Sequence, residues 1–300
     1  MDMTQNKCCR HGASLRRRRR RRRNILRSII FSCSIIAVAV FVAVGSRMIT
    51  SGDGGTNRYD VEAGNNTYDN AVIENSKISE KNKIQNNQSM LDDIMNSTQY
   101  PKQLKDLALK NEEALEFVYD YPAEHVKEHP IDLTEEASMD SVPLFVQWDK
   151  RWGYEKYSGN FFAASGCGPT TLSMVVVYLT HNREASPIAV AKYSKESGYS
   201  VDGSGSSWTL ISEGCRHYGV KAKTVALDES RMKAELDAGH PIVINVGPGD
   251  FTDTGHFMVI TGYDDEGFSI NDPNSIEKSG KRWLFKNISS QIRAVWSMYV

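Results

Sequence analysis

A cysteine set between two glycines, followed at once by a proline and a long apolar run, is the feature that most constrains this chain. The segment reads Gly166-Cys167-Gly168-Pro169, and residues 170–179 after it are mainly apolar and β-branched. Such a run predicts a buried helix, and proline is favoured at its start because the missing N–H would have no helical acceptor there. Cys167 is therefore predicted at a helix N-terminus, where unpaired N–H groups and the helix dipole favour negative charge.

A thiolate is such a negative charge, and it is the nucleophilic form of cysteine. Gly166 and Gly168 are expected to leave the sulfur of Cys167 uncrowded and to let a substrate backbone come close. The alternative is a buried structural cysteine beside a tight turn. The cysteine segment by itself does not choose between a reactive and a structural thiol.

The C-terminal part of the chain supplies a histidine and an aspartate with the spacing of a β-hairpin. A strand that begins at or near His256 is followed by an Asp- and Gly-rich turn at 264–267 and by a returning strand that stops at Asp272. The midpoint of the pair falls within this turn, so both side chains should lie directly opposite or diagonally on one face. A carboxylate beside an imidazole fixes its tautomer and stabilises its charged form. Cys167, His256 and Asp272 are therefore a candidate nucleophile, base and orienting residue.

Gln147 completes the candidate catalytic set. It ends a short apolar, strand-like run at 142–146. A side-chain amide at this point could stabilise the oxyanion of a tetrahedral intermediate, together with the backbone N–H of Cys167. The alternative for Gln147 is an ordinary surface amide.

These segments together resemble a known family. The resemblance rests on four segments in order: Val142–Gly153, Gly166–Thr170, Gly255–Tyr263 and Asn271–Pro273. They resemble the bacteriocin-processing type of cysteine peptidase, also called double-glycine leader peptidase-like, of the papain-like superfamily. The resemblance covers about residues 140–300. It implies an α+β, papain-like fold, in which a helix bearing the nucleophile packs on an antiparallel sheet bearing the His and Asp.

The resemblance also implies a role for each of the four residues. Cys167 would be the nucleophile, His256 the base, Asp272 the orienting residue and Gln147 the oxyanion donor. The order of the remaining predicted elements agrees with an α+β domain, because helices come first and strands follow. Helices are predicted at 187–197 and 208–218, and strands at 220–226, 241–246 and 283–285. The loop at 198–207 is either one wall of a substrate cleft or a plain connection.

Charge divides the chain more sharply than its net charge of −1 suggests. Residues 1–47 hold twelve Lys and Arg and one Asp, a charge of +11, so residues 48–300 carry −12. The arginine run 16–23 comes just before the apolar run 29–44, which is the positive-inside pattern of a membrane span. We expect a single uncleaved signal-anchor helix at 25–46, with the N-terminus in the cytoplasm and the catalytic part outside the cell.

Two alternatives attach to this N-terminal region. The segment Ala43-Val44-Gly45 resembles a small-residue cleavage site, so the apolar run could be a removable signal peptide. An arginine run can also mark a nucleic-acid patch, but beside an apolar span the anionic headgroups of the inner leaflet are the expected contact. No nucleic-acid partner is therefore predicted.

The predicted organisation has five parts. They are an Arg-rich cytoplasmic tail at 1–24, the anchor at 25–46, a disordered extracellular stalk at 47–100, a helical N-terminal arm at 101–139 and the peptidase-like domain at 140–300. The stalk is rich in small and polar residues and poor in aromatic ones, so it cannot bury enough apolar surface to fold. The arm carries a partial apolar stripe over 101–119 and can pack on the catalytic domain.

The sequence favours a membrane-anchored extracellular cysteine peptidase that hydrolyses peptide bonds through a thioester acyl-enzyme. Its partner would be a peptide or protein substrate, and its oligomeric state is left open. A cell-wall peptide amidase with the same triad and a non-catalytic peptide-binding module are the alternatives. No metal or cofactor is expected, because no cluster has zinc-ligand spacing and no phosphate-binding loop is present. Cys215 is expected to be a small helix residue, since a disulfide with Cys167 would block the nucleophile.

Overall fold

The computed structural model describes residues 66–300, and the surroundings of side chains from residue 79 onward. Contacts within the described part define a compact unit at Tyr68–Val300. The predicted tail and anchor lie outside the described residues, as does the first part of the predicted stalk. Within the described part, no helix has both the length and the apolar character needed to cross a membrane.

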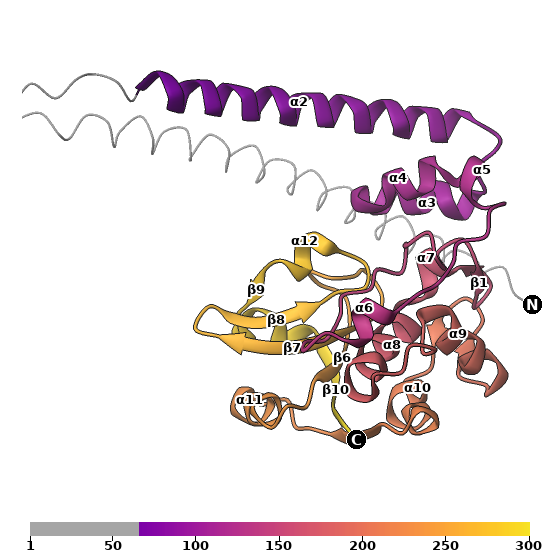
Figure 1. The fold of residues 1–300 in the computed structure, drawn as a ribbon, viewed down its shortest axis with the longest axis vertical. Coiled ribbons are helices and arrows are strands. Elements are labelled where there is room, and N and C mark those ends of the chain that lie inside the picture. Colours follow the sequence, from indigo (N-terminus) through magenta and orange to yellow (C-terminus); the bar gives the residue numbers. More distant parts are fainter. Residues whose placement is uncertain (1–65) are drawn as a thin grey trace, which may run out of the picture. The chain divides into compact units, whose positions relative to one another are not determined.

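A six-stranded antiparallel sheet forms the centre of the C-terminal half (Figure 1). The strand order is β5-β10-β6-β7-β8-β9, so β10, which comes last in the chain, lies between β5 and β6. The strands are β5 (Lys221–Thr224), β6 (Ile242–Val246), β7 (His256–Asp264), β8 (Gly267–Asn271), β9 (Arg282–Trp283) and β10 (Ile292–Tyr299). The sequence predicted all of these strands except β10.

One face of the sheet packs against the helix that carries the cysteine. This helix, α8 (Cys167–Thr180), is buried over most of its length and packs with α9 (Pro187–Glu196). Its apolar side chains share a core cluster with β6, β7 and β10; members include Leu172, Val175, Val243, Val259 and Trp296. The predicted α+β fold, with the nucleophile-bearing helix on an antiparallel sheet, is confirmed.

The opposite face of the sheet is also covered. A second core cluster joins it to α11 (Glu229–Asp237) and α13 (Phe285–Ile288) through residues such as Met232, Ile244, Met258 and Ile288. Successive residues of a strand point to opposite faces of the sheet. A strand that is covered on both faces is therefore apolar along its length and does not alternate between apolar and polar residues. All of β6 and the first five residues of β7 are buried accordingly.

Shorter elements complete the domain. The short helices and strands are α3 (Lys102–Lys110), α4 (Leu115–Tyr119), α5 (Tyr121–Glu124), α6 (Thr134–Ala137), α7 (Phe162–Ser165), α10 (Thr209–Ser212), α12 (Ile276–Ser279), β1 (Lys156–Tyr157), β2 (Asn160–Phe161), β3 (Ser200–Val201) and β4 (Gly205–Ser206). Three 3₁₀ turns are η1 (Glu112–Ala114), η2 (Gly214–Tyr218) and η3 (Ser289–Gln291). The helix predicted at 208–218 is therefore split into α10 and η2.

The helix predicted over 101–119 is interrupted at Asn111. This residue has an extended backbone, with φ −135° and ψ 100°, and its side chain accepts the N–H of Glu113. Asn favours this N-cap role because its side-chain oxygen satisfies an N–H group that has no helical acceptor. The arm thus consists of α3, then the η1 turn, then α4.

The predicted disordered stalk at 47–100 needs a correction over its second half. Residues Asn66–Asn96 form the helix α2. The C-terminal end of α2 contributes a buried Ile94 and the partly buried Met90 and Leu91 to an apolar cluster shared with α3 and α4. The low overall hydrophobicity of the segment concealed this helix, because its apolar packing residues are confined to its C-terminal end and packing contributes most of the stability of a helix in a protein.

Candidate active site

Cys167 is the first residue of α8, and Gly166 precedes the helix. The N–H of Thr170 donates to the carbonyl of Gly166 over 3.0 Å, which is the first turn of the helix. Pro169 has no N–H, and the N–H groups of Cys167 and Gly168 have no helical acceptor at this terminus. The Cys167 side chain is partly exposed and forms no disulfide. The local sequence thus places a partly buried thiol at the positive end of a buried helix.

The two glycines beside Cys167 are required by close packing. A Cβ at Gly166 would lie 2.5 Å from the ring of Phe162, and one at Gly168 would lie 2.5 Å from the Ser206 hydroxyl. Real Cβ atoms essentially never come so close to another heavy atom. The sequence indicated that these glycines give access to the sulfur, and the structure adds a packing reason for both of them. They let α8 begin against α7 and β4.

His256 and Asp272 lie at the open end of the β7–β8 hairpin. His256 is the first residue of β7, and Asp272 follows the last residue of β8. The register pairs Val259 with Asn271, so one further residue places Asp272 opposite Met258 and diagonal to His256. A register shift between Ile260 and Gly262 sets this diagonal arrangement. The Nε2 atom of His256 lies 2.6 Å from Oδ1 of Asp272.

The other side of the His256 ring meets Cys167. Burial alone would raise the pKa of the Cys167 thiol, but the hydrogen bond and charge of His256 lower it below its ordinary value. Backbone N–H groups of Phe257 and Gly168 lower this pKa further. Because Nε2 faces Asp272, the Nδ1 side of the ring is the side left for the sulfur. Cys167 and His256 lie on elements far apart in the sequence, and the packing of α8 on β7 brings them together.

The buried carboxylate of Asp272 sets the charge of the imidazole. Burial alone would lower the pKa of His256, but the charge of Asp272 and its hydrogen bond, followed by those of Cys167, raise this pKa to about 10. Asp272 is 0% exposed and His256 is 6% exposed, so water screens their interaction little. At neutral pH the cysteine and histidine are therefore favoured as a thiolate and imidazolium pair.

Asp272 is itself held by the turn that follows it. Its Oδ1 also accepts the backbone N–H of Asn274 over 2.8 Å, and its own N–H donates to the Ser279 hydroxyl over 2.9 Å. The second carboxylate oxygen, Oδ2, is buried and has no hydrogen-bond partner among the described atoms. The sequence drew attention to Asp272 but not to Asn274, because a turn residue after Asp-Pro shows no functional signal by itself.

Gln147 lies beside the same cavity, and it is not a surface amide. It is 4% exposed, and its side-chain Nε2 donates to the carbonyl of Ala163 over 2.7 Å. The same Nε2 is 3.4 Å from Oδ1 of Asn274, while Oε1 of Gln147 is buried without a partner. The bond to Ala163 fixes which way the amide faces, because the opposite orientation would set two oxygens against each other. The short bond to Ala163 takes one N–H of the amide, and the longer contact turns the other N–H toward Asn274.

Cys167, His256 and Gln147 line a cavity of about 590 Å³. One side of it is lined by α3 of the arm and by Asn111, and another by the loop 249–255. The loop 198–207, predicted as one possible wall, does not belong to the lining residues. Instead its Ser206 packs on Gly168 and hydrogen-bonds with the Tyr157 hydroxyl over 2.6 Å. The arm forms one wall of this cavity, and the sequence did not predict that role for it.

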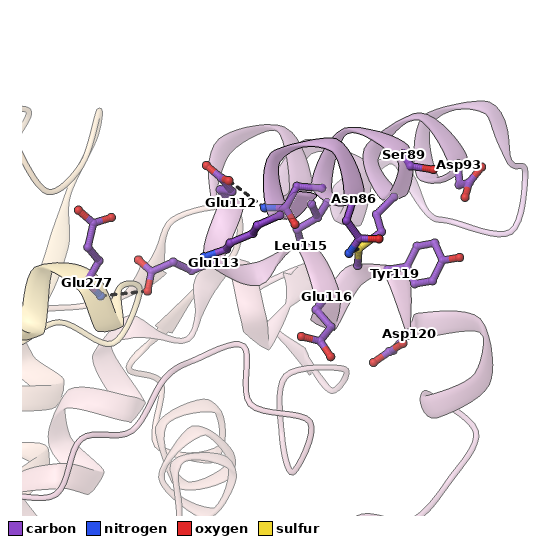
Figure 2. Close-up of a pocket in the computed structure, with 13 residues that line it drawn as sticks. Asn86, Ser89, Asp93, Glu112, Glu113, Leu115, Glu116, Tyr119, Asp120 and Glu277 are labelled. Atoms are coloured by element: carbon purple, nitrogen blue, oxygen red, sulfur yellow. Dashed lines mark hydrogen bonds between the residues drawn. The ribbon is translucent and has the colours of Figure 1, made fainter. Parts of the chain in front are cut away.

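A larger hollow of about 720 Å³ lies between α2 and the arm (Figure 2). Its lining is rich in carboxylates and includes no Cys or His. Among the described residues, no group of three or more Cys, His, Asp or Glu side chains could hold a metal ion. The chemistry of a nucleophile and base is thus found in the smaller cavity, around Cys167.

Cys215 provides a contrast to Cys167. It is buried in η2 and forms no disulfide. Burial raises the pKa of its thiol to about 11, against a smaller opposing effect of Arg216. A buried thiol with a raised pKa is a poor nucleophile. Within the described part of the chain, the two cysteines therefore have opposite environments.

Comparison with known proteins gives the following matches. Residues 139–300 match the Peptidase_C39-like family. The peptidase domain of Streptococcus ComA, a bi-functional ABC transporter involved in a quorum sensing pathway, is 18% identical, with a TM-score of 0.39 over 53% of this chain and 96% of that chain. A candidate C39-like peptidase from Bacillus anthracis is 17% identical, with a TM-score of 0.34 over 53% of this chain and 95% of that chain. A search of curated proteins finds no match.

Proposed function

Because the chain belongs to the Peptidase_C39-like family and is a cysteine peptidase, we propose that it hydrolyses peptide bonds through Cys167, His256 and Asp272. The observation that carries this proposal is the arrangement around one imidazole. Cys167 and His256 line one cavity, His256 lowers the pKa of the Cys167 thiol, and Nε2 of His256 lies 2.6 Å from Oδ1 of Asp272. A nucleophile, a base and an orienting carboxylate in this order are the requirements of covalent acyl transfer.

The acylation step follows from the charges of the pair. The Cys167 thiolate attacks the carbonyl carbon of the scissile bond, and the carbonyl electrons move onto the oxygen. When this tetrahedral intermediate collapses, the C–N bond breaks and the His256 imidazolium gives its proton to the leaving amine. The product is a thioester on Cys167 with a neutral His256.

Deacylation restores the starting state. Neutral His256 takes a proton from a water molecule, whose oxygen attacks the thioester carbonyl. The C–S bond then breaks, the acid product leaves, and the thiolate and imidazolium are formed again. Asp272 keeps its charge throughout, and its contribution is to orient and stabilise the imidazolium.

The oxyanion of the tetrahedral intermediate needs donors close to Cys167. The N–H of Cys167 lies at the start of α8, where the helix dipole also favours negative charge. Gln147 is the proposed second donor, because its side chain borders the same cavity and the Ala163 carbonyl holds it in place. A fixed donor stabilises the developing charge without the cost of reorienting during the reaction.

We extend the proposal to location through the charge step in the sequence. The run Arg16–Arg23 beside an apolar stretch supports a single signal-anchor at 25–46. The catalytic domain would then act outside the cell, on peptide or protein substrates near the membrane surface.

Peptide-library profiling of the purified full chain tests the activity. We expect cleavage of peptide bonds by the natural chain, and none by Cys167→Ala, which removes the sulfur but leaves the fold. Equal cleavage by both proteins would refute the proposed nucleophile. Cleavage confined to peptides derived from the cell wall would instead identify the chain as a cell-wall peptide amidase that uses the same residues.

A further inference from the structure

The arm that precedes the family match contacts the turn that carries the catalytic carboxylate. The match begins at residue 139, whereas Asn111 and Glu113 lie between α3 and α4 of the arm. Both side chains hydrogen-bond with the segment 272–277, here called the acid turn, which contains Asp272. These contacts join parts of the chain that are 162 to 164 residues apart.

Asn111 makes a fixed, two-sided contact. Its Nδ2 donates to the backbone carbonyl of Asn274 over 2.9 Å and to the side-chain oxygen of Asn274 over 3.1 Å. Its Oδ1 accepts the N–H of Glu113 over 3.0 Å. Because the cap to Glu113 requires an oxygen on that side, the NH₂ group must face Asn274. Asn111 is 9% exposed, so this geometry is protected from water.

Asn274 transmits this contact to two residues of the proposed catalytic set. Its backbone N–H donates to the same Asp272 oxygen that lies 2.6 Å from His256. Its side-chain oxygen faces both Asn111 and Gln147, the latter over 3.4 Å. In addition, the backbone N–H of Gln147 donates to the backbone carbonyl of Pro273 over 2.7 Å. A shift of the acid turn would therefore displace the orienting carboxylate and the proposed oxyanion donor together.

Glu113 fixes the other end of the acid turn. Its Oε2 accepts the N–H of Ile276 over 2.7 Å and that of Glu277 over 3.0 Å, and its Oε1 accepts the hydroxyl of Ser275. Figure 2 shows Glu113 reaching across to Glu277 from the arm. These N–H groups belong to the first turn of α12 and have no helical acceptors. The carboxylate thus satisfies the start of α12 and ties it to the arm.

The arm is packed against the domain by an apolar cluster. Leu104, Leu115 and Phe117 of the arm share an apolar cluster with Phe161 and Ala163 of the domain. Ala163 is the residue whose carbonyl accepts from the Gln147 side chain. The arm therefore contacts both residues that accept from this amide, Ala163 through the apolar cluster and Asn274 through Asn111.

Two further contacts fix the outer end of the arm. Phe117 stacks on Tyr154 with ring centroids 4.2 Å apart, and Lys150 pairs with Asp120 over 2.6 Å. The Lys150–Asp120 pair does not involve the acid turn, so it offers a matched control for the arm's attachment.

We propose that Asn111 and Glu113 are positioning residues of the peptidase, which hold the acid turn so that Asp272 and Gln147 are correctly placed around Cys167. This inference rests on the proposed function of Cys167, His256 and Asp272. It makes the arm part of the active site, although the arm lies outside the family match.

The substitution Asn111→Asp in the full chain separates positioning from helix capping. Asp keeps the oxygen that accepts from Glu113, but it replaces the NH₂ donor with an oxygen that repels both oxygens of Asn274. We expect kcat to fall about 10- to 100-fold with little change in KM, since small misplacements of reacting groups have effects of this size. The high-pH limb of kcat/KM should move to lower pH, because His256 loses part of its contact with Asp272. Asn111→Ser, which keeps the cap without the repulsion, should lie between Asn111→Asp and the natural chain.

The control is Lys150→Met, which breaks the arm–domain ion pair and leaves the acid turn untouched. It should keep the natural kcat and pH profile. Loss of activity to the same degree in Lys150→Met and Asn111→Asp would overturn the inference, because general packing of the arm would explain both. A natural pH profile and kcat in Asn111→Asp would overturn it as well. If Asn111→Asp does not fold, Glu113→Gln takes its place, with the same direction of change expected and the same outcomes against the inference.

Alkylation of Cys167 by iodoacetamide, followed by mass spectrometry of its peptide, separates this test from that of the proposed function. In the natural chain Cys167 should react far faster than Cys215 at mildly acidic pH, and in Asn111→Asp the rate at Cys167 should fall. Equal rates of the two cysteines in the natural chain would refute the proposed function itself. If Cys167 is alkylated fast in the natural chain and at the same rate in Asn111→Asp, only the positioning role is refuted.

Discussion

His256 and Asp272 meet as diagonal neighbours across a hairpin, with Nε2 of the imidazole 2.6 Å from Oδ1 of the carboxylate. The irregular register between Ile260 and Gly262 puts the two side chains on one face of the sheet, because the pairing of residues 262–264 continued without it would set Asp272 opposite Val259, three residues from His256 and on the other face. Both side chains are almost fully buried, and the other side of the ring contacts Cys167. The protonation of this one imidazole therefore links the carboxylate to the nucleophile, and the following predictions depend on it.

The first prediction concerns Asp272→Asn and pH. In the natural chain the pKa of His256 is raised to about 10, so the imidazolium is present below that pH and is lost as pH rises through it. Asn removes the charge that holds the proton, so the His256 pKa falls and the high-pH limb of kcat/KM moves toward neutral pH. The maximal kcat should also fall, but less than in Cys167→Ala. A pH–rate profile of both proteins checks this, and an unmoved high-pH limb would contradict the role of Asp272.

The second prediction concerns the interdependence of the catalytic pair. Cys167→Ala should abolish turnover, and His256→Ala should cost nearly as much, because the thiolate and its base act as a unit. The double variant should be no worse than Cys167→Ala alone. Steady-state kinetics of the three variants measure this, with circular dichroism to confirm folding. Additive losses in the double variant would show that the two residues act separately.

The third prediction contrasts the two described cysteines. The pKa of Cys167 is lowered through its contact with His256, whereas burial raises the pKa of Cys215 to about 11. At mildly acidic pH, iodoacetamide should label Cys167 much faster than Cys215. In His256→Ala the Cys167 rate should drop, because the stabilising charge is gone. The measurement is site-resolved mass spectrometry, and a Cys167 rate independent of His256 would contradict an activated thiolate.

The fourth prediction concerns Gln147→Ala. Removing one oxyanion donor should lower kcat by roughly 10²–10³ with little change in KM. The variant also leaves the buried carbonyl of Ala163 without its donor, which should lower the free energy of unfolding by about 1–3 kcal/mol. Kinetics and thermal unfolding measure the two effects. A change in KM alone would show that Gln147 contacts the substrate and does not hold the oxyanion.

The fifth prediction concerns topology. External protease applied to intact cells should remove the catalytic domain and leave the arginine-rich tail at 1–24 protected. The reason is the positive-inside arrangement of charge around the predicted anchor. Permeabilised cells serve as the control, since both parts should then be cut. A protected domain and a cleaved tail on intact cells would reverse the proposed orientation.

The sequence predicted much of the candidate site because its signals are local. A proline in the first turn of an apolar run placed Cys167 at a helix start, and a short turn placed His256 near Asp272. Both predictions need only neighbours within one helix or one hairpin. The predicted α+β fold followed from the same elements and from their order.

Sequence patterns failed where packing overrides a local preference. The polar composition of 66–96 predicted no regular structure, yet the apolar end of α2 packs on the arm and the segment is helical. The glycines beside Cys167 were interpreted as room for substrate, and their close packing on Phe162 and Ser206 was not predicted. Strand β10 was missed, although it pairs with both β5 and β6 in the centre of the sheet.

By itself, the sequence determined the kinds of catalytic group and the local elements that carry them. Only the tertiary structure decided how they meet: α8 packs on β7, which brings Cys167 to His256, and Asn111 reaches the acid turn from the arm. The physical reason is that periodicity and turn residues act over a few neighbours along the chain. Contacts between distant segments depend instead on which buried faces fit together, and that information is shared among all the packed side chains.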